Sequence, residues 1–381
     1  MTCALTGCHR TGSVGRVIRW RRGLVAAVVQ EWRGSLELDV TGADGGMFRA
    51  LAYPELVGRP SVGDEVLLSV AALEMGLGTG GYAFVVAIPS RLPEDTPVAG
   101  HMVKARYTPL QTVVEGAEEQ YRELMSASSV EGMPVVVADL HSALPAVLAG
   151  ILADLPSARV AYVMTDGGAL PLWFSRTVDG LREAGWLAAG TVTVGQAFGG
   201  DLECVTVHSG LLAARHVLGA DIAVVTQGPG NLGTGTAWGF SGVACGEAIN
   251  AAAVVGGRPV AALRVSSGDA RERHRGVSHH SLTAYGKVAL ARAEVALPSV
   301  SASSLDSASG SADDEFWRGV AMQVSELASR HTVVPVAVDG LDAALRSCPV
   351  PLRTMGRGLD EDYAAFLASA CAGRLAAADK V

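Results

Sequence analysis

The sequence has few cysteines and no long apolar run, and each shortage excludes a class of protein. Its six cysteines are scattered at positions 3, 8, 204, 245, 348 and 371. The first two have neither zinc-ribbon spacing nor a partner pair, so disulfides and a structural zinc site are not expected. No apolar stretch reaches the roughly 18 residues that a membrane-spanning helix needs. We therefore expect a cytoplasmic protein with no membrane partner.

Charge is also scarce, whereas glycine is abundant. Only 18% of the 381 residues are charged, 49% are hydrophobic, and the mean hydropathy is +0.30. The net charge of −8 argues against non-specific nucleic-acid binding by the whole chain. Glycine supplies 46 residues, about 12%, against a usual share near 7%. Most of this excess follows apolar runs, where a strand gives way to a loop.

The first quarter of the chain has a β pattern. The length predicts two domains, and residues 16–90 hold five short runs rich in Val and Leu, separated by turn signals. They predict a small β-barrel of the OB or SH3-like kind. We expect residues 1–15 to be a disordered leader and residues 91–109 to be a linker.

From residue 110 to 381 the pattern changes to alternating strands and helices. Near-continuous apolar runs such as "MPVVVADLH", "ARVAYVMTDGG" and "RPVAALRVSSGD" are each followed by a helical stretch. This alternation predicts a Rossmann-like, mostly parallel α/β sheet with helices on both faces. Residues 299–314 are of low complexity and are expected to form a mobile loop.

Polar and glycine-rich stretches follow the expected strands. In an open parallel sheet, ligands bind beyond the carboxyl ends of the strands. The stretches that follow five of the strands should therefore converge on one site. Their candidate residues are Asp139, His141, Asp166, Gln196 and Gln227, together with the segment "RERHRGVSHH" after the fifth strand.

The loop "QGPGNLGTGT" is a candidate anion-binding segment. Its backbone amides are open to close approach, and a helix is expected to follow, as in phosphate or carboxylate sites. It matches neither GxxxxGK[ST] nor GxGxxG, and a glycine-rich turn required only for packing is the alternative. The candidate substrate-binding residues of this loop are Gln227, Gly228, Gly230, Asn231, Gly233, Thr234 and Gly235.

Asp139 and His141 are two residues apart on an extended chain and should lie on the same side. Such a pair can chelate a divalent metal, or the carboxylate can orient the imidazole. We take both as candidate catalytic residues and metal ligands. The alternative is that Asp139 caps the following helix and His141 is merely polar.

The segment "RERHRGVSHH" concentrates arginine and histidine. Arg271, Arg273 and Arg275 alternate with other residues, so an extended loop would aim all three one way, as anion recognition demands. His279 and His280 are candidate catalytic residues. Because they are adjacent, we expect their rings to diverge and at most one to reach a shared centre. A solvated loop is the alternative.

Several motifs together resemble one family. "ADLHSALP", "TVTVGQAFGGDLE", "QGPGNLGTGT", "RHRGVSHHS" and "TMGRGLDED" are similar to the uncharacterised bacterial family called domain of unknown function 3866. The resemblance covers nearly the whole chain from about residue 16. It implies no assigned activity, so it carries over no catalytic role.

The leading interpretation is an enzyme, a hydrolase or transferase, that acts on a small anionic metabolite, phosphorylated compounds included. The glycine loop and the arginines would hold the anion, and the histidines or Asp139 would supply acid–base chemistry or a divalent metal. The alternative is a non-catalytic ligand sensor whose barrel binds RNA or protein. Neither the substrate nor a homo-oligomeric state can be assigned from the sequence.

Overall fold

The computed structural model describes residues 18–299 and 310–378, and the chain divides into two compact units at Asp95 and Thr96. The expected leader at residues 1–15 lies outside the described residues. Each unit has its own hydrophobic core.

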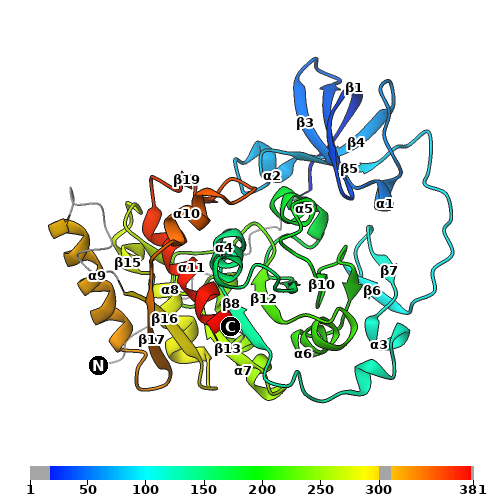
Figure 1. The fold of residues 1–381 in the computed structure, drawn as a ribbon. Helices are drawn as coiled ribbons and strands as arrows, with labels where there is room; N and C mark the ends of the chain where they lie inside the picture. The colour runs from blue at the N-terminus through cyan, green and yellow to red at the C-terminus, as the bar shows by residue number, and fades with distance from the viewer. Residues whose placement is uncertain (1–17, 300–309, 379–381) are drawn as a thin grey trace, which may run out of the picture. The chain divides into compact units, whose positions relative to one another are not determined.

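The first unit is a closed five-stranded barrel, which confirms the predicted β-barrel (Figure 1). The strands follow the order β1-β2-β3-β5-β4, and β3 pairs with β5 in parallel. A parallel pair in a five-stranded barrel is typical of OB-folds rather than of SH3-like barrels. Leu36, Leu38 and Val40 of one strand fill the interior. The strands are β1 (Trp20–Trp32), β2 (Ser35–Gly42), β3 (Met47–Ala52), β4 (Glu65–Ser69) and β5 (Ala83–Ala87), with short helices α1 (Pro54–Val57) and α2 (Ala71–Glu74) between them.

The second unit is built on an eight-stranded parallel sheet, as the alternating pattern predicts. Its order is β11-β10-β9-β12-β8-β13-β16-β17. The strands are β8 (Pro134–Val137), β9 (Val160–Thr165), β10 (Gly190–Thr193), β11 (Leu202–Glu203), β12 (Ile222–Gln227), β13 (Arg258–Ala261), β16 (Glu294–Ser299) and β17 (Thr332–Ala337).

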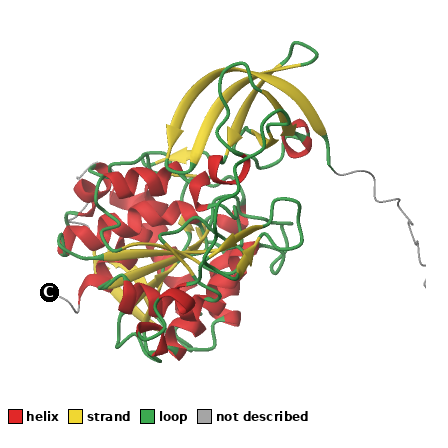
Figure 2. Ribbon diagram, turned by 90° about the vertical axis from the view of Figure 1, so that its right-hand side faces the viewer, coloured by secondary structure: helices red, strands yellow, loops and turns green. Residues whose placement is uncertain are grey.

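Both faces of this sheet are covered by helices, which confirms the Rossmann-like class (Figure 2). Alternate strand residues face opposite cores: Val135 and Val137 enter one, and Val136 enters the other. On the first face lie α6 (Val207–Leu212), α7 (Ala244–Val254), α8 (His279–Thr283) and α9 (Gly310–Ser325). On the second lie α4 (Leu144–Asp154), α5 (Arg176–Glu183), α10 (Leu341–Arg346) and α11 (Tyr363–Ala377).

The strand order creates a switch point beside β8. The chain leaves β8 through α4 and crosses towards β9, whereas it leaves β12 through α7 and crosses β8 in the opposite direction. Connections that diverge in this way leave a crevice at the carboxyl ends of the two strands, where ligands of open α/β sheets bind. The loops after β8 and β12 border this crevice.

Two segments that were expected to be loops contain regular structure. Residues 91–109 are not all linker, because β6 (Met102–Lys104) pairs with β7 (Thr112–Val114), just before the short α3 (Ala117–Gln120). Lys104 is fully buried, and its ammonium group donates to backbone carbonyls of the α/β unit. In the expected loop 299–314, Ser299 ends β16 and α9 begins at Gly310, while residues 300–309 lie outside the described residues.

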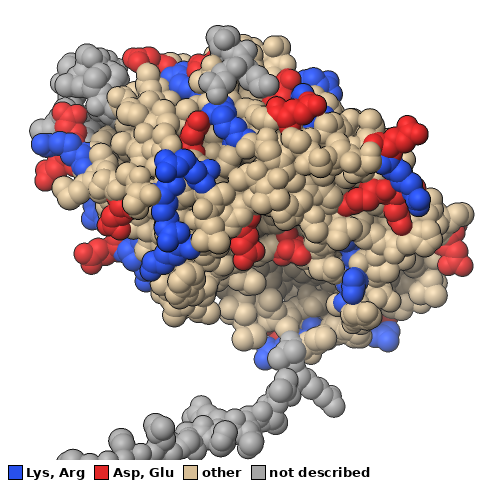
Figure 3. All heavy atoms as spheres, turned by 90° about the horizontal axis from the view of Figure 1, so that it is seen from below, with Lys and Arg blue, Asp and Glu red and all other residues tan. Residues whose placement is uncertain are grey.

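Two features concern contact with membranes and charged partners: the apolarity of the helices and the distribution of surface charge. In the described part of the chain, no helix has the length and apolarity that a membrane crossing requires. On the face shown in Figure 3, acidic and basic side chains are interspersed over a mostly uncharged surface.

Helices α4 and α11 touch through glycine. A Cβ added at Gly150 would lie 1.9 Å from the carbonyl oxygen of Ala370, and one added at Gly373 would lie 2.0 Å from that of Val147. These distances are far below van der Waals contact, so only glycine permits this helix spacing.

We expect Gly373→Val to destabilise the α/β unit by about 1–3 kcal/mol or more, because the added side chain forces the two helices apart. Urea denaturation followed by far-UV circular dichroism measures the change. The matched control is Gly319→Ala in α9, where an added Cβ meets nothing within 4 Å. It should stabilise the helix by up to about 1 kcal/mol. Equal stability of the Gly373→Val variant and the wild type would contradict the packing described.

Candidate functional site

The loops after β8 and β12 are tied together at the switch point. The side-chain amide of Gln227, the last residue of β12, donates to the backbone oxygen of Asp139 at 2.8 Å and to the Asn231 side chain at 2.9 Å. Gln227 therefore joins the strand end after β8 to the glycine loop, and both belong to one edge of the sheet.

Three of the four glycines of the loop are required for packing or backbone geometry; Gly233 has room for a Cβ. A Cβ at Gly228 would lie 2.4 Å from the carbonyl oxygen of Ala169, and Gly230 and Gly235 have φ of +90° and +80°. Thr234 donates to a carbonyl within the loop. A helical stretch follows the loop, as expected: the 3₁₀ turn at Ser241–Val243 leads into α7, which begins at Ala244.

One half of the loop borders a cavity of about 550 Å³. Two arginines, Arg176 and Arg353, lie in its wall. Four predicted residues of the glycine segment and one predicted histidine also line it: Gln227, Gly228, Gly230, Asn231 and His141. Gly233 and Gly235 do not line this cavity.

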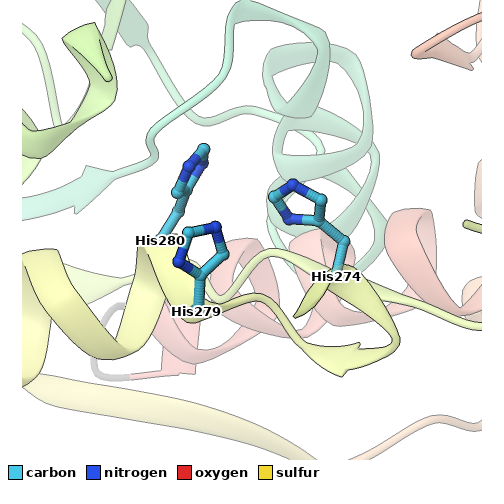
Figure 4. Close-up of side chains that lie close together, drawn as sticks. All are labelled: His274, His279 and His280. Atoms are coloured by element: carbon cyan, nitrogen blue, oxygen red, sulfur yellow. The ribbon is translucent and has the colours of Figure 1, made fainter. Parts of the chain in front are cut away.

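Beyond the other half of the loop, three histidines converge (Figure 4). One ring nitrogen from each of His274, His279 and His280 lies within 4.8 Å of the other two. The rings of His279 and His280 are 4.3 Å apart, centre to centre. The prediction that only one of these two reaches a shared centre is therefore wrong, because both rings come from the first turn of α8 and lie close to each other and to His274.

Neighbouring side chains fix two of the three rings. His274 Nδ1 lies 2.7 Å from Ser278 Oγ. His280 is stacked on Phe240, with 3.7 Å between ring centres and 3° between planes, so the end of the glycine loop forms one wall of the cluster. The third ring differs, because His279 Nε2 is buried without a hydrogen-bond partner.

The three imidazoles are uncharged at neutral pH. Burial lowers the pKa of His274 to about 4 and that of His280 to about 3. Burial also lowers the pKa of His279, and the charge of Arg273 adds to this effect. Arg264 contributes to the lowering at all three rings. Each ring therefore keeps a nitrogen lone pair at pH 7.

Arg264 links the cluster to Asp139. It donates to His280 Nδ1 over a long 3.3 Å contact, and the same Nη1 lies 3.8 Å from Asp139 Oδ2. That carboxylate oxygen is buried and has no hydrogen-bond partner. Burial raises the pKa of Asp139, and the Arg264 charge opposes the rise.

The side chains of Arg271, Arg273 and Arg275 do not share one direction, although this was predicted for an extended loop. Arg271 is held by Asp269 through two side-chain hydrogen bonds of 2.9 and 2.8 Å. Arg273 faces the glycine loop: a Cβ added at Gly235 would lie 3.7 Å from its guanidinium. Arg275 is exposed and is not among the charges that lower the histidine pKa values. A 3₁₀ turn at Glu272–His274 breaks the extended alternation on which the prediction depended.

Asp139 and His141, the predicted metal pair, have separate partners in the structure. Both ring nitrogens of His141 are occupied, Nδ1 by the Tyr162 hydroxyl at 3.0 Å and Nε2 by Ser175 Oγ at 2.7 Å. This histidine is a buried polar link between β9 and the start of α5. Asp139 lies instead beside Arg264.

Asp166 and Gln196 lie together but not at the cluster. Asp166 accepts the backbone N–H of Gln196 at 2.8 Å. The Gln196 side chain accepts from the backbone of Arg106, and it lines a second cavity of about 530 Å³ with His101 and Tyr107.

Sequence reasoning missed a buried ionic anchor. Asp362, which is fully buried, accepts from Ser266 Oγ at 2.6 Å and from two backbone amides after β14 (Val265–Ser266). Arg357 binds Asp362 at 2.9 Å and Asp269 at 3.2 Å. The late motif "TMGRGLDED" thus fastens the loop that leads into the histidine cluster.

His274, Arg264 and Phe240 were also missed as site residues. The spacing His-x4-His-His was the available signal for His274. Nothing in the sequence marks Phe240 or Arg264, since neither belongs to a chemical motif and both reach the cluster only through the fold.

Together the fold and these contacts define a Rossmann-like α/β protein with a histidine–arginine cluster at the carboxyl edge of its sheet. The family described as "Protein of unknown function (DUF3866)" matches residues 49–373, and the chain belongs to this family. No curated protein and no solved structure matches the chain.

We expect Asp362→Ala to lower the free energy of unfolding by about 3–5 kcal/mol, because it removes the buried acceptor that Arg357, Ser266 Oγ and two backbone amides share. Asp360→Ala is the matched control. Its carboxylate is exposed and pairs with Arg346 at the surface, so the change should stay within about 0.5 kcal/mol. Urea denaturation of both variants gives the comparison, and similar losses would contradict an anchoring role.

Proposed function

We propose that this protein is an enzyme that acts on a small anionic metabolite, a class that includes phosphorylated compounds. The observation that carries the proposal is the meeting of three uncharged imidazoles with two guanidinium groups, those of Arg264 and Arg273, at the carboxyl edge of the sheet. Clusters of titratable groups with shifted pKa values in such a position are typical of active sites.

The charges of the cluster favour an anionic ligand. Arg273 lies beside the glycine loop, and Arg264 has only a long contact to the Asp139 carboxylate. An anion bound between them would offset their repulsion and accept charge-assisted hydrogen bonds. The cavity that Arg176 and Arg353 line, on the same loop, would hold the remainder of the molecule.

The neighbouring groups suit hydrolysis or group transfer. An uncharged imidazole accepts a proton from water or from a substrate hydroxyl, and guanidinium groups stabilise negative charge that develops in the transition state. Asp139 is buried beside Arg264, and its carboxyl group could accept or donate a proton at this place. These groups would supply a nucleophile, a proton and charge stabilisation at one place.

The alternative, an RNA-binding barrel, has less support from the arginines of residues 18–95, the part of this unit that the structure describes. Arg19 and Arg21 at the start of β1 pair with Glu74, and Arg22 pairs with Glu65 of the same barrel. These arginines are partly neutralised by their own unit, so they form no basic stripe of the kind that tracks a phosphate backbone.

We expect inorganic phosphate, pyrophosphate or a sugar phosphate to raise the melting temperature of the wild type. A ligand at about 100 times its dissociation constant adds roughly 2.7 kcal/mol to stability. Arg273→Ala should weaken this binding at least tenfold, about 1.4 kcal/mol, because it removes the guanidinium that faces the loop.

Arg275→Ala is the control for Arg273→Ala, since it removes the same charge. Both arginines are exposed, but it is the Arg273 guanidinium that lies beside Gly235 of the glycine loop. Its melting curve with phosphate should match that of the wild type. Equal effects of the two substitutions would show that the anion responds to net charge alone and would count against this site.

A further inference from the structure

We propose that His274, His279 and His280 hold one divalent transition-metal ion, zinc or an ion of similar preference. Three imidazoles and an open position for water or substrate are the donor set of catalytic zinc sites. Imidazole also suits iron, nickel and copper, whereas magnesium and calcium prefer oxygen ligands. The inference concerns the ion that the cluster binds, and it rests on the proposed function only for the use of that ion in a reaction.

The spacing of the rings fits a shared ion. With zinc–nitrogen bonds of about 2.0–2.1 Å, the nitrogens of a tetrahedral site lie about 3.3 Å apart. The three candidate nitrogens lie within 4.8 Å of one another. The nitrogens therefore need to close by no more than about 1.5 Å to reach the spacing of a shared ion.

The orphaned nitrogen of His279 is the second, independent observation. His279 Nε2 is buried and has no hydrogen-bond partner in the protein. It points towards the space between the other two rings (Figure 4). A buried polar atom without a partner destabilises the fold, and an ion bound to its lone pair would remove this cost.

The surroundings of the other two rings resemble an outer coordination shell. Ser278 Oγ binds His274 Nδ1 at 2.7 Å, so Nε2 of this ring is left for the cluster. Such contacts to the second nitrogen orient metal-bound histidines. His280 differs, because Arg264 donates to its Nδ1 at 3.3 Å. An ion that takes this lone pair must displace a long and weak contact, after which Arg264 is free to approach Asp139.

The arginines oppose a bare dication, and this opposition has a consequence for binding. Arg264, Arg271 and Arg273 all act on the histidine rings. A divalent ion therefore binds best when an anion, such as hydroxide or phosphate, accompanies it. By reciprocity, phosphate must tighten metal binding by the same factor by which the metal tightens phosphate binding.

Metal content tests this inference without any activity assay. Purified wild type is stripped with a chelator, dialysed against Zn²⁺ or Co²⁺, and analysed by mass spectrometry of the elements. We expect about one ion per chain. The Co²⁺-loaded protein should also show the visible absorption of a low-coordinate site. His279→Ala and His274→Ala should each weaken the affinity at least about tenfold.

His208→Ala is the matched control, because His208 is an exposed histidine in α6. It should bind metal as the wild type does. Circular dichroism shows whether the cluster variants are folded, and His279→Gln, which keeps a polar side chain at this position, replaces His279→Ala if that variant unfolds. Equal metal content in the wild type and in folded His279 variants would overturn the inference, as would wild type that binds no Zn²⁺ or Co²⁺.

Failure of this inference and failure of the proposed function are distinguishable. If the stripped protein still shows an Arg273-dependent shift with phosphate but takes up no metal, the metal site is wrong and the anion site stands. If metal binds and phosphate does not change the melting temperature at any metal concentration, the proposed anionic substrate is wrong and the metal site stands.

Discussion

The buried carboxylate of Asp362 is the contact on which the arrangement of the site depends. It lies just before α11, yet it accepts hydrogen bonds from the loop that follows β14, almost one hundred residues earlier in the chain. Through Arg357 it also reaches Asp269, which holds Arg271. A buried carboxylate that is shielded from water is tolerated only when hydrogen-bond donors surround it. This requirement fixes the path of the chain into the histidine cluster.

A second constraint is the low charge of the protein. Because so few residues are charged, the carboxyl edge of the sheet stands out for its guanidinium groups. These groups act on three imidazoles, of which those of His274 and His280 are buried and that of His279 is partly exposed. Burial keeps the rings neutral, and Asp139 offers Arg264 only a long ion pair. Such an arrangement is poorly balanced by the protein alone, and an anionic ligand, with or without a metal ion, would balance it.

Much of the fold was predictable, because strands buried on both faces of a parallel sheet read as continuous apolar runs. The edge that carries the site followed from the same pattern. The order of the strands within the sheet could not be predicted from the sequence, since it is decided by packing between distant segments. The cluster depended on two local features without a sequence signature: the 3₁₀ turn at Glu272–His274, and the pairing of Arg271 with Asp269. His141 was misread because its buried partners, Tyr162 and Ser175, are distant in sequence.

The central claim is that the histidine cluster is a reactive centre for anionic metabolites. The most direct measurement is mass spectrometry of a cell metabolite extract incubated with wild type or with folded His279→Ala protein. We expect wild type to consume at least one anionic compound that the variant leaves unchanged. The assay is run in phosphate-free buffer that contains Zn²⁺. The claim would be contradicted if both proteins consumed the same compounds, or if neither protein consumed any.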